Sequence, residues 1–167
     1  MTPKKPELIH TVSILTRRLK EGKTYEDFRR AWFHTTGFGV VGKEAEGSRA
    51  QLLTFINIFD PREIIVVGLA ATTLEQLESA LDIDVKVRGE NPLDEVIEPA
   101  IQRTFALQVA DDDFSATGDI PYSPARINGK ETTMQESAVT LAALQEMYTR
   151  AGAKRDAINK ARKDRAR

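Results

Sequence analysis

Residues 24–37 read TYEDFRRAWFHTTG, and this stretch predicts a short, firmly bounded helix. Thr24 and Asp27 have the spacing of a capping box, with Asp in place of the usual Glu or Gln, so the helix start is marked. Gly37 can turn the chain out of the helix. The large apolar side chains recur at spacings of three and four and form one stripe: Tyr25, Phe28 and Trp32. The segment therefore organises a core, and it also contains one of the two histidines.

The composition is that of an ordinary globular domain. The chain has 167 residues, of which 41% are hydrophobic and 29% charged. The longest apolar runs, near residues 64–71, are too short to span a membrane, and no apolar core follows the basic N-terminal residues. We therefore expect a cytoplasmic protein without a membrane partner. Because the chain has no cysteine, disulfides, thiolate metal sites and cysteine nucleophiles are excluded.

The net charge of −1 conceals an asymmetry. Residues 150–167 carry a net charge of +6, so the rest of the chain carries −7. A basic tail can attract acidic partners, but cations are also favoured at a helix C-terminus. No aromatic residue follows Tyr148, which argues against stacking on a single-stranded nucleic acid.

The first half of the chain predicts three strands around the first helix. Residues 9–19 are rich in β-branched residues and precede that helix. Residues 37–47 form a glycine-rich loop without dinucleotide-binding spacing. Two further apolar runs, 51–59 and 63–70, flank Asp60-Pro61-Arg62, which is typical of a hairpin turn.

The next region predicts a second helix and a fourth strand. Thr72 and Glu75 form a capping-box pattern ahead of a leucine stripe. Residues 82–88 fit either an extra strand or a frayed helical continuation, and the pattern does not choose between them. Asn91-Pro92 favours a short helix that Pro99 would close, and alternation over 105–110 favours a strand.

The predicted order is strand, helix, strand, strand, helix, strand, followed by a C-terminal helix from about Thr133. This is the ferredoxin-like βαββαβ order, an α+β fold with a four-stranded antiparallel sheet and both helices on one face. We divide the chain into a domain at 1–114, an irregular connection at 115–131 and a helical extension with a basic end at 132–167. Because the apolar stripe fades after Ala151, we expect that end to project or to pack on a partner.

Both faces of the predicted sheet are too apolar for one of them to face water. Ile14 belongs to one face of its strand, and Ser13 and Leu15 belong to the other. The strands at 51–59 and 63–70 also have apolar residues on both faces. A half-solvated antiparallel sheet should alternate apolar and polar residues. The second face therefore predicts an interaction site, for which a second copy of the same sheet is the simplest cover.

The element order, the two-sided strands and the Phe28-x-x-x-Trp32 helix resemble the dimeric α+β barrel superfamily. The resemblance spans roughly residues 8–114 and is closest to the family associated with ethyl tert-butyl ether degradation. In that family a histidine follows the aromatic pair; here His34 comes two residues after Trp32, and Thr36 occupies the expected place. The resemblance implies a homodimer that binds a small organic molecule, with an oxygenase, isomerase or degradative accessory role.

His34 is the candidate catalytic residue. It lies about 120° from Phe28 around the helix, at the margin of the buried stripe, where an imidazole suits acid–base work. The alternative is a helix-end histidine that bonds terminal carbonyls or water. It is favoured because no carboxylate has helical spacing to His34: Asp27 is seven residues, or about 10 Å, away along the helix. His10 is a weaker candidate, with an edge or surface role.

Polar residues within apolar strands are the candidate ligand-binding groups. Ser13, Asn57 and Gln108 could orient a ligand between the paired sheets, with Trp32 and Phe55 lining the pocket. Equally, the polar three could bond one another in a filled dimer core. No metal site is predicted, because consecutive strand residues such as Asp111–Asp113 point to opposite faces.

Two functions from different classes remain open. One is a small-molecule-binding protein or enzyme with an apolar cavity, for which the sequence leaves the cofactor unknown. The other is a non-catalytic protein that assembles through its sheet face and its C-terminal helix.

Overall fold

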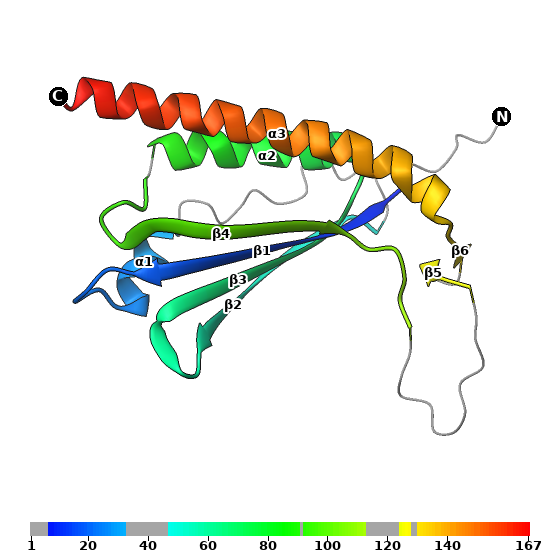
Figure 1. Ribbon diagram of the computed structural model, residues 1–167, viewed down its shortest axis with the longest axis horizontal. Coiled ribbons are helices and arrows are strands. Elements are labelled where there is room, and N and C mark those ends of the chain that lie inside the picture. Colours follow the sequence, from blue (N-terminus) through cyan, green and yellow to red (C-terminus); the bar gives the residue numbers. More distant parts are fainter. Residues whose placement is uncertain (1–6, 33–46, 91, 113–123, 128–129) are drawn as a thin grey trace.

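The computed structural model describes residues 7–32, 47–90, 92–112, 124–127 and 130–167 (Figure 1). The predicted α+β class, with an antiparallel sheet and a C-terminal helix, is confirmed. Within the described ranges, no helix has the length and apolar character needed to cross a membrane. The elements follow one another as β1 (Ile9–Leu19), α1 (Tyr25–Trp32), β2 (Arg49–Asn57), β3 (Asp60–Thr72), α2 (Leu74–Glu90), β4 (Ile97–Leu107), β5 (Arg126–Ile127), β6 (Lys130–Glu131) and α3 (Met134–Arg165).

The main sheet has four antiparallel strands in the order β2-β3-β1-β4. β1 and β3 are therefore the central strands, and β2 and β4 are the edges. Residues that pair across these strands share a face of the sheet. Ser13, for example, pairs with Gly68 of β3 and Phe105 of β4, and Gly68 pairs in turn with Leu52 of β2.

The N-terminal caps explain where the helices begin. The backbone N–H of Thr24 donates to Asp27 Oδ2 (2.9 Å) and that of Asp27 to Thr24 Oγ1 (3.3 Å), so the first capping box is confirmed. The second prediction was wrong by one residue, because Thr73 and Gln76 form the box ahead of α2. Thr72 instead ends β3, since it continues the pairing with β1.

Two further boundaries differ from the prediction. The hairpin between β2 and β3 turns at residues 58–59, and Asp60-Pro61-Arg62 belongs to β3. Residues 82–88, which the sequence left undecided, are helical and complete α2. Their alternation therefore reflects a helix whose two sides are both partly covered, rather than a strand.

The predicted helix at 92–98 is absent, and the described chain turns directly into β4. The N–H groups of Val96 and Ile97 both donate to the carbonyl of Leu93 (2.9 Å each), which closes a tight turn. Pro99 lies inside β4, where it is tolerated because β4 is an edge strand. The short hairpin of β5 and β6 likewise lies within the segment at 115–131 that was predicted to be irregular.

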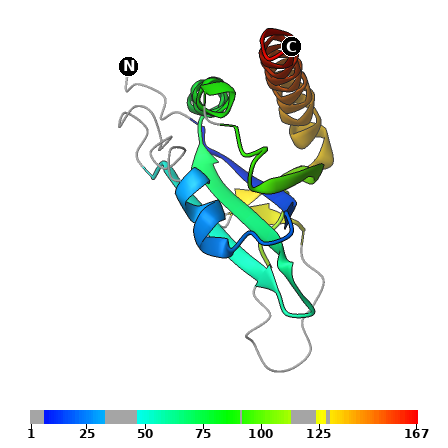
Figure 2. The same ribbon diagram turned by 90° about the vertical axis from the view of Figure 1, so that its left-hand side faces the viewer.

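All three helices contact the same side of the sheet, which we call the covered face. Phe28 and Trp32 of α1 pack with Ile64 and Val66 of β3, and Phe28 is 0% exposed. α2 and α3 meet in a second cluster that reaches Leu107 of β4. Figure 2 shows α2 and α3 beside one another above the sheet, with α1 against a different part of it.

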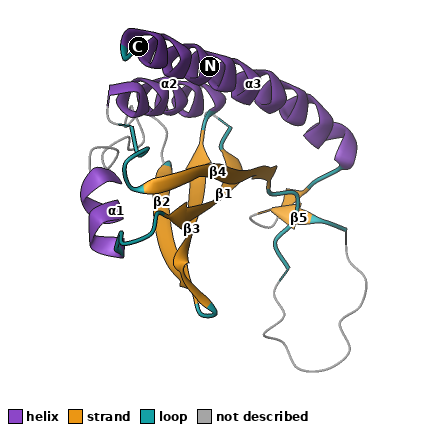
Figure 3. Cartoon of the chain, turned by 60° about the vertical axis from the view of Figure 1, so that its left-hand side comes forward, coloured by secondary structure: helices purple, strands orange, loops and turns teal. Residues whose placement is uncertain are grey.

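The basic end of α3 does not project from the fold but follows α2 (Figure 3). Arg150 Nη2 bonds Glu78 Oε1 and Lys154 Nζ bonds Asp82 Oδ1, each at 2.6 Å. Further along, Arg162 reaches Asp94 in the turn before β4. The prediction of a projecting end was wrong, because the acidic side of α2 was not recognised as its partner.

The opposite side of the sheet, the open face, has no helix among the described elements. Its exposed apolar residues include Ile14 (38%), Phe55 (49%) and Leu69 (42%). The strand pairings place further apolar residues on this face: Val12, Leu53, Ile65 and Val67. The open face is thus a broad apolar surface across three strands.

Candidate ligand-binding cleft

A cleft of about 410 Å³ lies between the covered face and the helices α2 and α3. Its volume is in the range of small-molecule sites. β1, β3 and β4 supply the sheet side through Ser13, Gly68 and Phe105. Successive turns of α2 and α3 supply the opposite side, because residues three and four apart on a helix share one face.

Most of the cleft wall is apolar. Its aliphatic residues come from strands and helices: Leu15, Leu77, Leu81, Val85 and Ile97. Phe105 of β4 and Tyr148 of α3 stack with ring centroids 4.1 Å apart and an interplanar angle of 20°. Burial raises the pKa of Tyr148 to about 12, so its phenol is neutral at physiological pH. This wall can contact the apolar body of a ligand.

Four arginines from four different elements also line the cleft: Arg17 of β1, Arg88 of α2, Arg103 of β4 and Arg155 of α3. Arg17 is only 8% exposed, although it carries a charge. Burial, together with the neighbouring Arg103 and Arg88, lowers the pKa of Arg17 to about 10. Burial also lowers the pKa values of Arg88 and Arg103. The cleft therefore concentrates positive charge where solvent screening is weak.

Asp84 is the carboxyl group among these arginines, and burial raises its pKa. It attracts Arg88 and Arg17 electrostatically but forms no ion pair with either among the described residues. A second lining carboxylate, Asp94, is already paired with Arg162. The positive charge of the cleft is therefore only partly balanced by the protein.

Several guanidinium nitrogens in the cleft are buried without hydrogen-bond partners in the described part of the chain. These atoms are Nε of Arg17 and all three nitrogens of Arg88. Buried polar groups are normally paired, and buried charges especially so. By contrast, Arg62 on the same sheet donates to the carbonyl of Leu19 (2.7 Å) and to Glu98 (2.7 Å). The unpartnered buried guanidinium nitrogens among the described residues therefore belong to arginines of the cleft.

Gly68 determines how closely β1 and β3 can place their side chains at the cleft floor. A Cβ at Gly68 would lie 2.4 Å from Ser13 Oγ and 3.1 Å from a methyl carbon of Leu52. Any larger residue would have to displace the Ser13 hydroxyl. The glycine therefore keeps Ser13 within the cleft.

The structure divides the predicted ligand-binding residues among different places. Ser13 and Trp32 were predicted to line a pocket between two paired sheets, but they line the cleft on the covered face. Phe55 lies on the open face. It pairs with Ile65 of β3, and Ile65 pairs with Thr16 of β1, which shares a face with Ile14. Their roles in ligand binding remain predictions.

Asn57 and Gln108 have local hydrogen-bonding roles instead. Asn57 donates to Glu63 (2.8 Å) and accepts from the N–H of Phe59 (2.9 Å), which stabilises the hairpin turn. Gln108 Nε2 donates to the carbonyl of Ala110 (3.1 Å). Among the described residues, no hydrogen bond joins Ser13, Asn57 and Gln108 to one another. His34, the catalytic candidate, lies outside the described residues.

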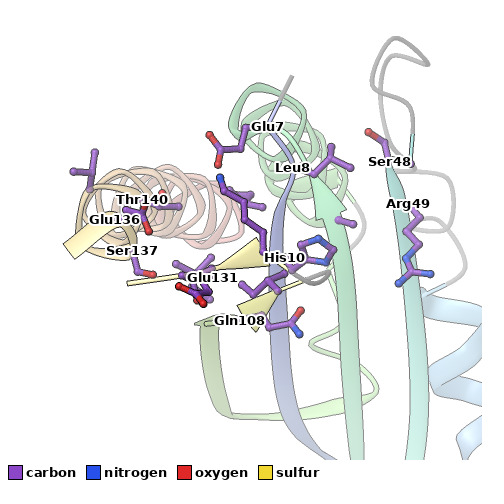
Figure 4. Close-up of a pocket in the computed structure, with 18 residues that line it drawn as sticks. Glu7, Leu8, His10, Ser48, Arg49, Gln108, Glu131, Glu136, Ser137 and Thr140 are labelled. Atoms are coloured by element: carbon purple, nitrogen blue, oxygen red, sulfur yellow. The ribbon is translucent and has the colours of Figure 1, made fainter. Parts of the chain in front are cut away.

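A second, more open pocket of about 1220 Å³ lies where the N-terminal part of β1 meets the β5–β6 hairpin and the start of α3. Figure 4 shows His10 and Gln108 near one another in this pocket. The N–H of Gln108 donates to the carbonyl of His10 (2.8 Å), so strand pairing brings the two together. Because Glu7, Arg49 and Glu131 on its wall are exposed, the pocket offers weaker electrostatic interactions than the cleft.

No cluster of three or more metal-ligating side chains occurs within the described residues. Asp111 and Asp112 are exposed beyond the end of β4, and Asp113 lies outside the described residues.

Comparison with protein-family models, curated proteins and solved structures finds no match for the chain. Its function must therefore be argued from the cleft and the two faces of the sheet.

The cleft arginines were not predicted from the sequence. In β1, Arg17 lies on the same face as Ser13 and Leu15, which both line the cleft. A charged residue on the apolar side of a central strand was the available signal. Its meaning depends on knowing that this side is buried beneath α2 and α3, which the strand pattern does not show.

Proposed function

We propose that the protein binds a small molecule in the cleft between the covered face and helices α2 and α3. The observation that carries this proposal is a cleft of about 410 Å³ in which a mainly apolar wall meets converging polar groups. Such a combination is typical of ligand sites, because apolar contacts supply affinity and a few polar groups supply orientation.

We further propose that the fold is ferredoxin-like and that two copies pair through their open faces as a dimeric α+β barrel. The element order and the sheet order β2-β3-β1-β4 support the first part. The exposed apolar surface around Ile14 and Phe55 supports the second. The likeness to the ethyl tert-butyl ether degradation family favours an oxygenase, isomerase or degradative accessory role.

The binding function is tested by nuclear magnetic resonance titration of the full chain with a library of neutral and charged fragments. We expect shifts centred on Ser13, Leu81 and Val85, and we expect Ala80→Phe, which fills the cleft, to abolish them. Glu78→Phe, on the same helix outside the cleft lining, is the matched control. Shifts confined to the open face, or an absence of binders, would contradict the proposal.

Catalysis is a separate part of this proposal and depends on His34. If His34 acts as an acid–base or orienting group, His34→Ala should reduce turnover of aromatic or ether-type compounds. The pH profile of the remaining activity should lose its near-neutral inflection, because the imidazole titrates there. Unchanged turnover and an unchanged profile would remove His34 from the proposal.

The second candidate function is non-catalytic assembly through the sheet, which the exposed side chains of the open face specifically favour. It predicts a stable oligomer and no ligand in the cleft. The C-terminal helix contributes less to this alternative, because Arg150 and Lys154 already bind α2 of the same chain. Sedimentation measurements combined with the fragment titration distinguish the two functions.

A further inference from the structure

We propose that the cleft recognises a small organic anion, whose carboxylate or phosphate group is held by Arg17 and Arg88. This inference rests on the proposed binding function of the cleft and names the class of its ligand. It assigns a role to the guanidinium groups that the fold itself leaves without partners.

Hydrogen-bond donors of two cleft arginines are buried and unsatisfied. Nε of Arg17 and all three guanidinium nitrogens of Arg88 are buried and have no hydrogen-bond partner in the described part of the chain. An uncompensated buried charge is strongly destabilising. A guanidinium group matches the two oxygens of a carboxylate or phosphate and binds them in a bidentate manner. An oxyanion would satisfy these donors and neutralise the charge at once.

The charged groups around the site are mostly positive. β1 supplies Arg17, β4 supplies Arg103, α2 supplies Arg88 with Asp84, and α3 supplies Arg155. These groups are close enough for Arg17 to be influenced by all of the others. The other carboxylate in the lining, Asp94, is paired with Arg162. Asp156 of α3, outside the lining, offsets part of the positive charge at Arg103. The field within the cleft therefore favours an anion over a cation or a neutral molecule.

Several arginines outside the cleft, by contrast, have carboxylate partners. Arg18 bonds Asp60, Arg62 bonds Glu98, and Arg150 bonds Glu78. Arg17 and Arg88 instead keep buried guanidinium nitrogens without hydrogen-bond partners. Binding sites commonly retain such locally destabilising arrangements, because the ligand completes them.

The apolar wall of the cleft favours an apolar body for the rest of the ligand. The stacked rings of Phe105 and Tyr148 and the leucines of α2 line the same cleft as the arginines. A molecule with an oxyanion at one end and an aromatic or aliphatic body would contact both. Free inorganic phosphate would use only the arginines, so it should bind more weakly than its organic esters.

Isothermal titration calorimetry of the full chain tests this with naphthoate, naphthyl phosphate, neutral naphthamide and inorganic phosphate. We expect at least one of the organic anions to bind about tenfold or more tightly than naphthamide, as charge-assisted bonds imply. The better of the two identifies carboxylate or phosphate as the preferred group. Inorganic phosphate that binds as tightly as naphthyl phosphate would overturn the requirement for an organic body.

Substitutions test which arginines bind the anion. Arg88→Met and Arg17→Met should abolish the preference for the anion, whereas Arg150→Met, which removes a surface arginine of α3, should leave it intact. Thermal unfolding checks that the variants remain folded, and we expect their midpoints without ligand to equal or exceed that of the wild type. The wild-type midpoint should rise with added anion, and those of the cleft variants should not.

The failures can be separated. Equal binding of naphthoate, naphthyl phosphate and naphthamide at the cleft would overturn the anion specificity and leave the binding function in place. An anion preference that survives both cleft variants would overturn the assignment to Arg17 and Arg88. The absence of binding by any of the four compounds would contradict the anion site, and the wider fragment library would then decide the binding function.

Discussion

The two faces of the sheet are both rich in apolar residues, yet they differ in what accompanies those residues. On the covered face, Arg17 and Arg103 stand among leucines beneath two helices. The open face instead presents Ile14, Phe55 and Leu69 without a covering helix among the described elements. The hydrophobic effect alone therefore does not distinguish the two faces.

The difference indicates two modes of recognition. A cleft with buried charges and stacked rings is selective, because a partner without the complementary charge leaves donors unsatisfied. A broad apolar surface is less selective and suits a flat, extended partner such as a second sheet. The following predictions test this contrast, beginning with the largest expected effect.

Phe28→Ala should have the largest effect on stability. Phe28 is 0% exposed and packs between α1 and the covered face, so we expect its truncation to lower the free energy of unfolding by about 3–5 kcal/mol. Urea denaturation measures this loss. Phe55→Ala is the matched control on the open face, and a similar loss in dilute, monomeric protein would break the contrast between the faces.

Ile14→Glu should act on assembly rather than on the fold. A carboxylate in the middle of the open face would be buried by a second sheet, so we expect self-association to weaken by roughly a hundredfold, or about 2.7 kcal/mol. Sedimentation equilibrium measures the change. Val139→Glu alters an exposed residue of α3 and should leave association unchanged. A wild-type chain that remains monomeric would refute pairing through this face.

Arg17→Met should stabilise the protein without ligand, because it removes a buried charge. Replacement of such a charge by an apolar residue is expected to raise the free energy of unfolding by about 1–3 kcal/mol at neutral pH. The folded-state pKa of about 10 lies below the ordinary value of 12.5, so the cost of Arg17 should diminish as the pH rises through 10. Urea denaturation at two pH values measures both effects, and a less stable variant would show that Arg17 is compensated within the fold.

Glu78→Gln should have the smallest effect. It breaks the bond to Arg150, but both side chains are about half exposed, so we expect a loss of about 0.2–1 kcal/mol that disappears in high salt. Thermal unfolding at two salt concentrations provides the measurement. A larger loss that disappears in high salt would mean that the contact between α2 and α3 depends on charge more than on the buried apolar cluster of Leu77, Leu144 and Met147.

Much of the fold follows from local patterns. The capping box at Thr24, the apolar stripe of α1 and the alternation in β1 are properties of neighbouring residues, and the structure confirms them. Errors arose where tertiary context overrode local preference. Pro99 was expected to end a helix, but an edge strand tolerates it, and the Asp60-Pro61-Arg62 turn signal was absorbed into β3.

The candidate site was less predictable. Ser13 and Trp32 lie at the cleft beneath the helices, although they were predicted for a pocket between paired sheets. The arginines were not predicted, because β1, α2, β4 and α3 each contribute one and their sequence positions are far apart. Nothing in any single segment indicates that these charges meet.

The sequence by itself therefore determined the α+β class, the two-sided apolar character of the strands and the start of the first helix. These properties depend on the periodicity of side chains along one segment. Only the tertiary structure decided which face lies under the helices, that the basic end of α3 binds α2, and that four arginines share one cleft. Such juxtapositions depend on how distant segments pack, and electrostatic interactions act through space rather than along the chain.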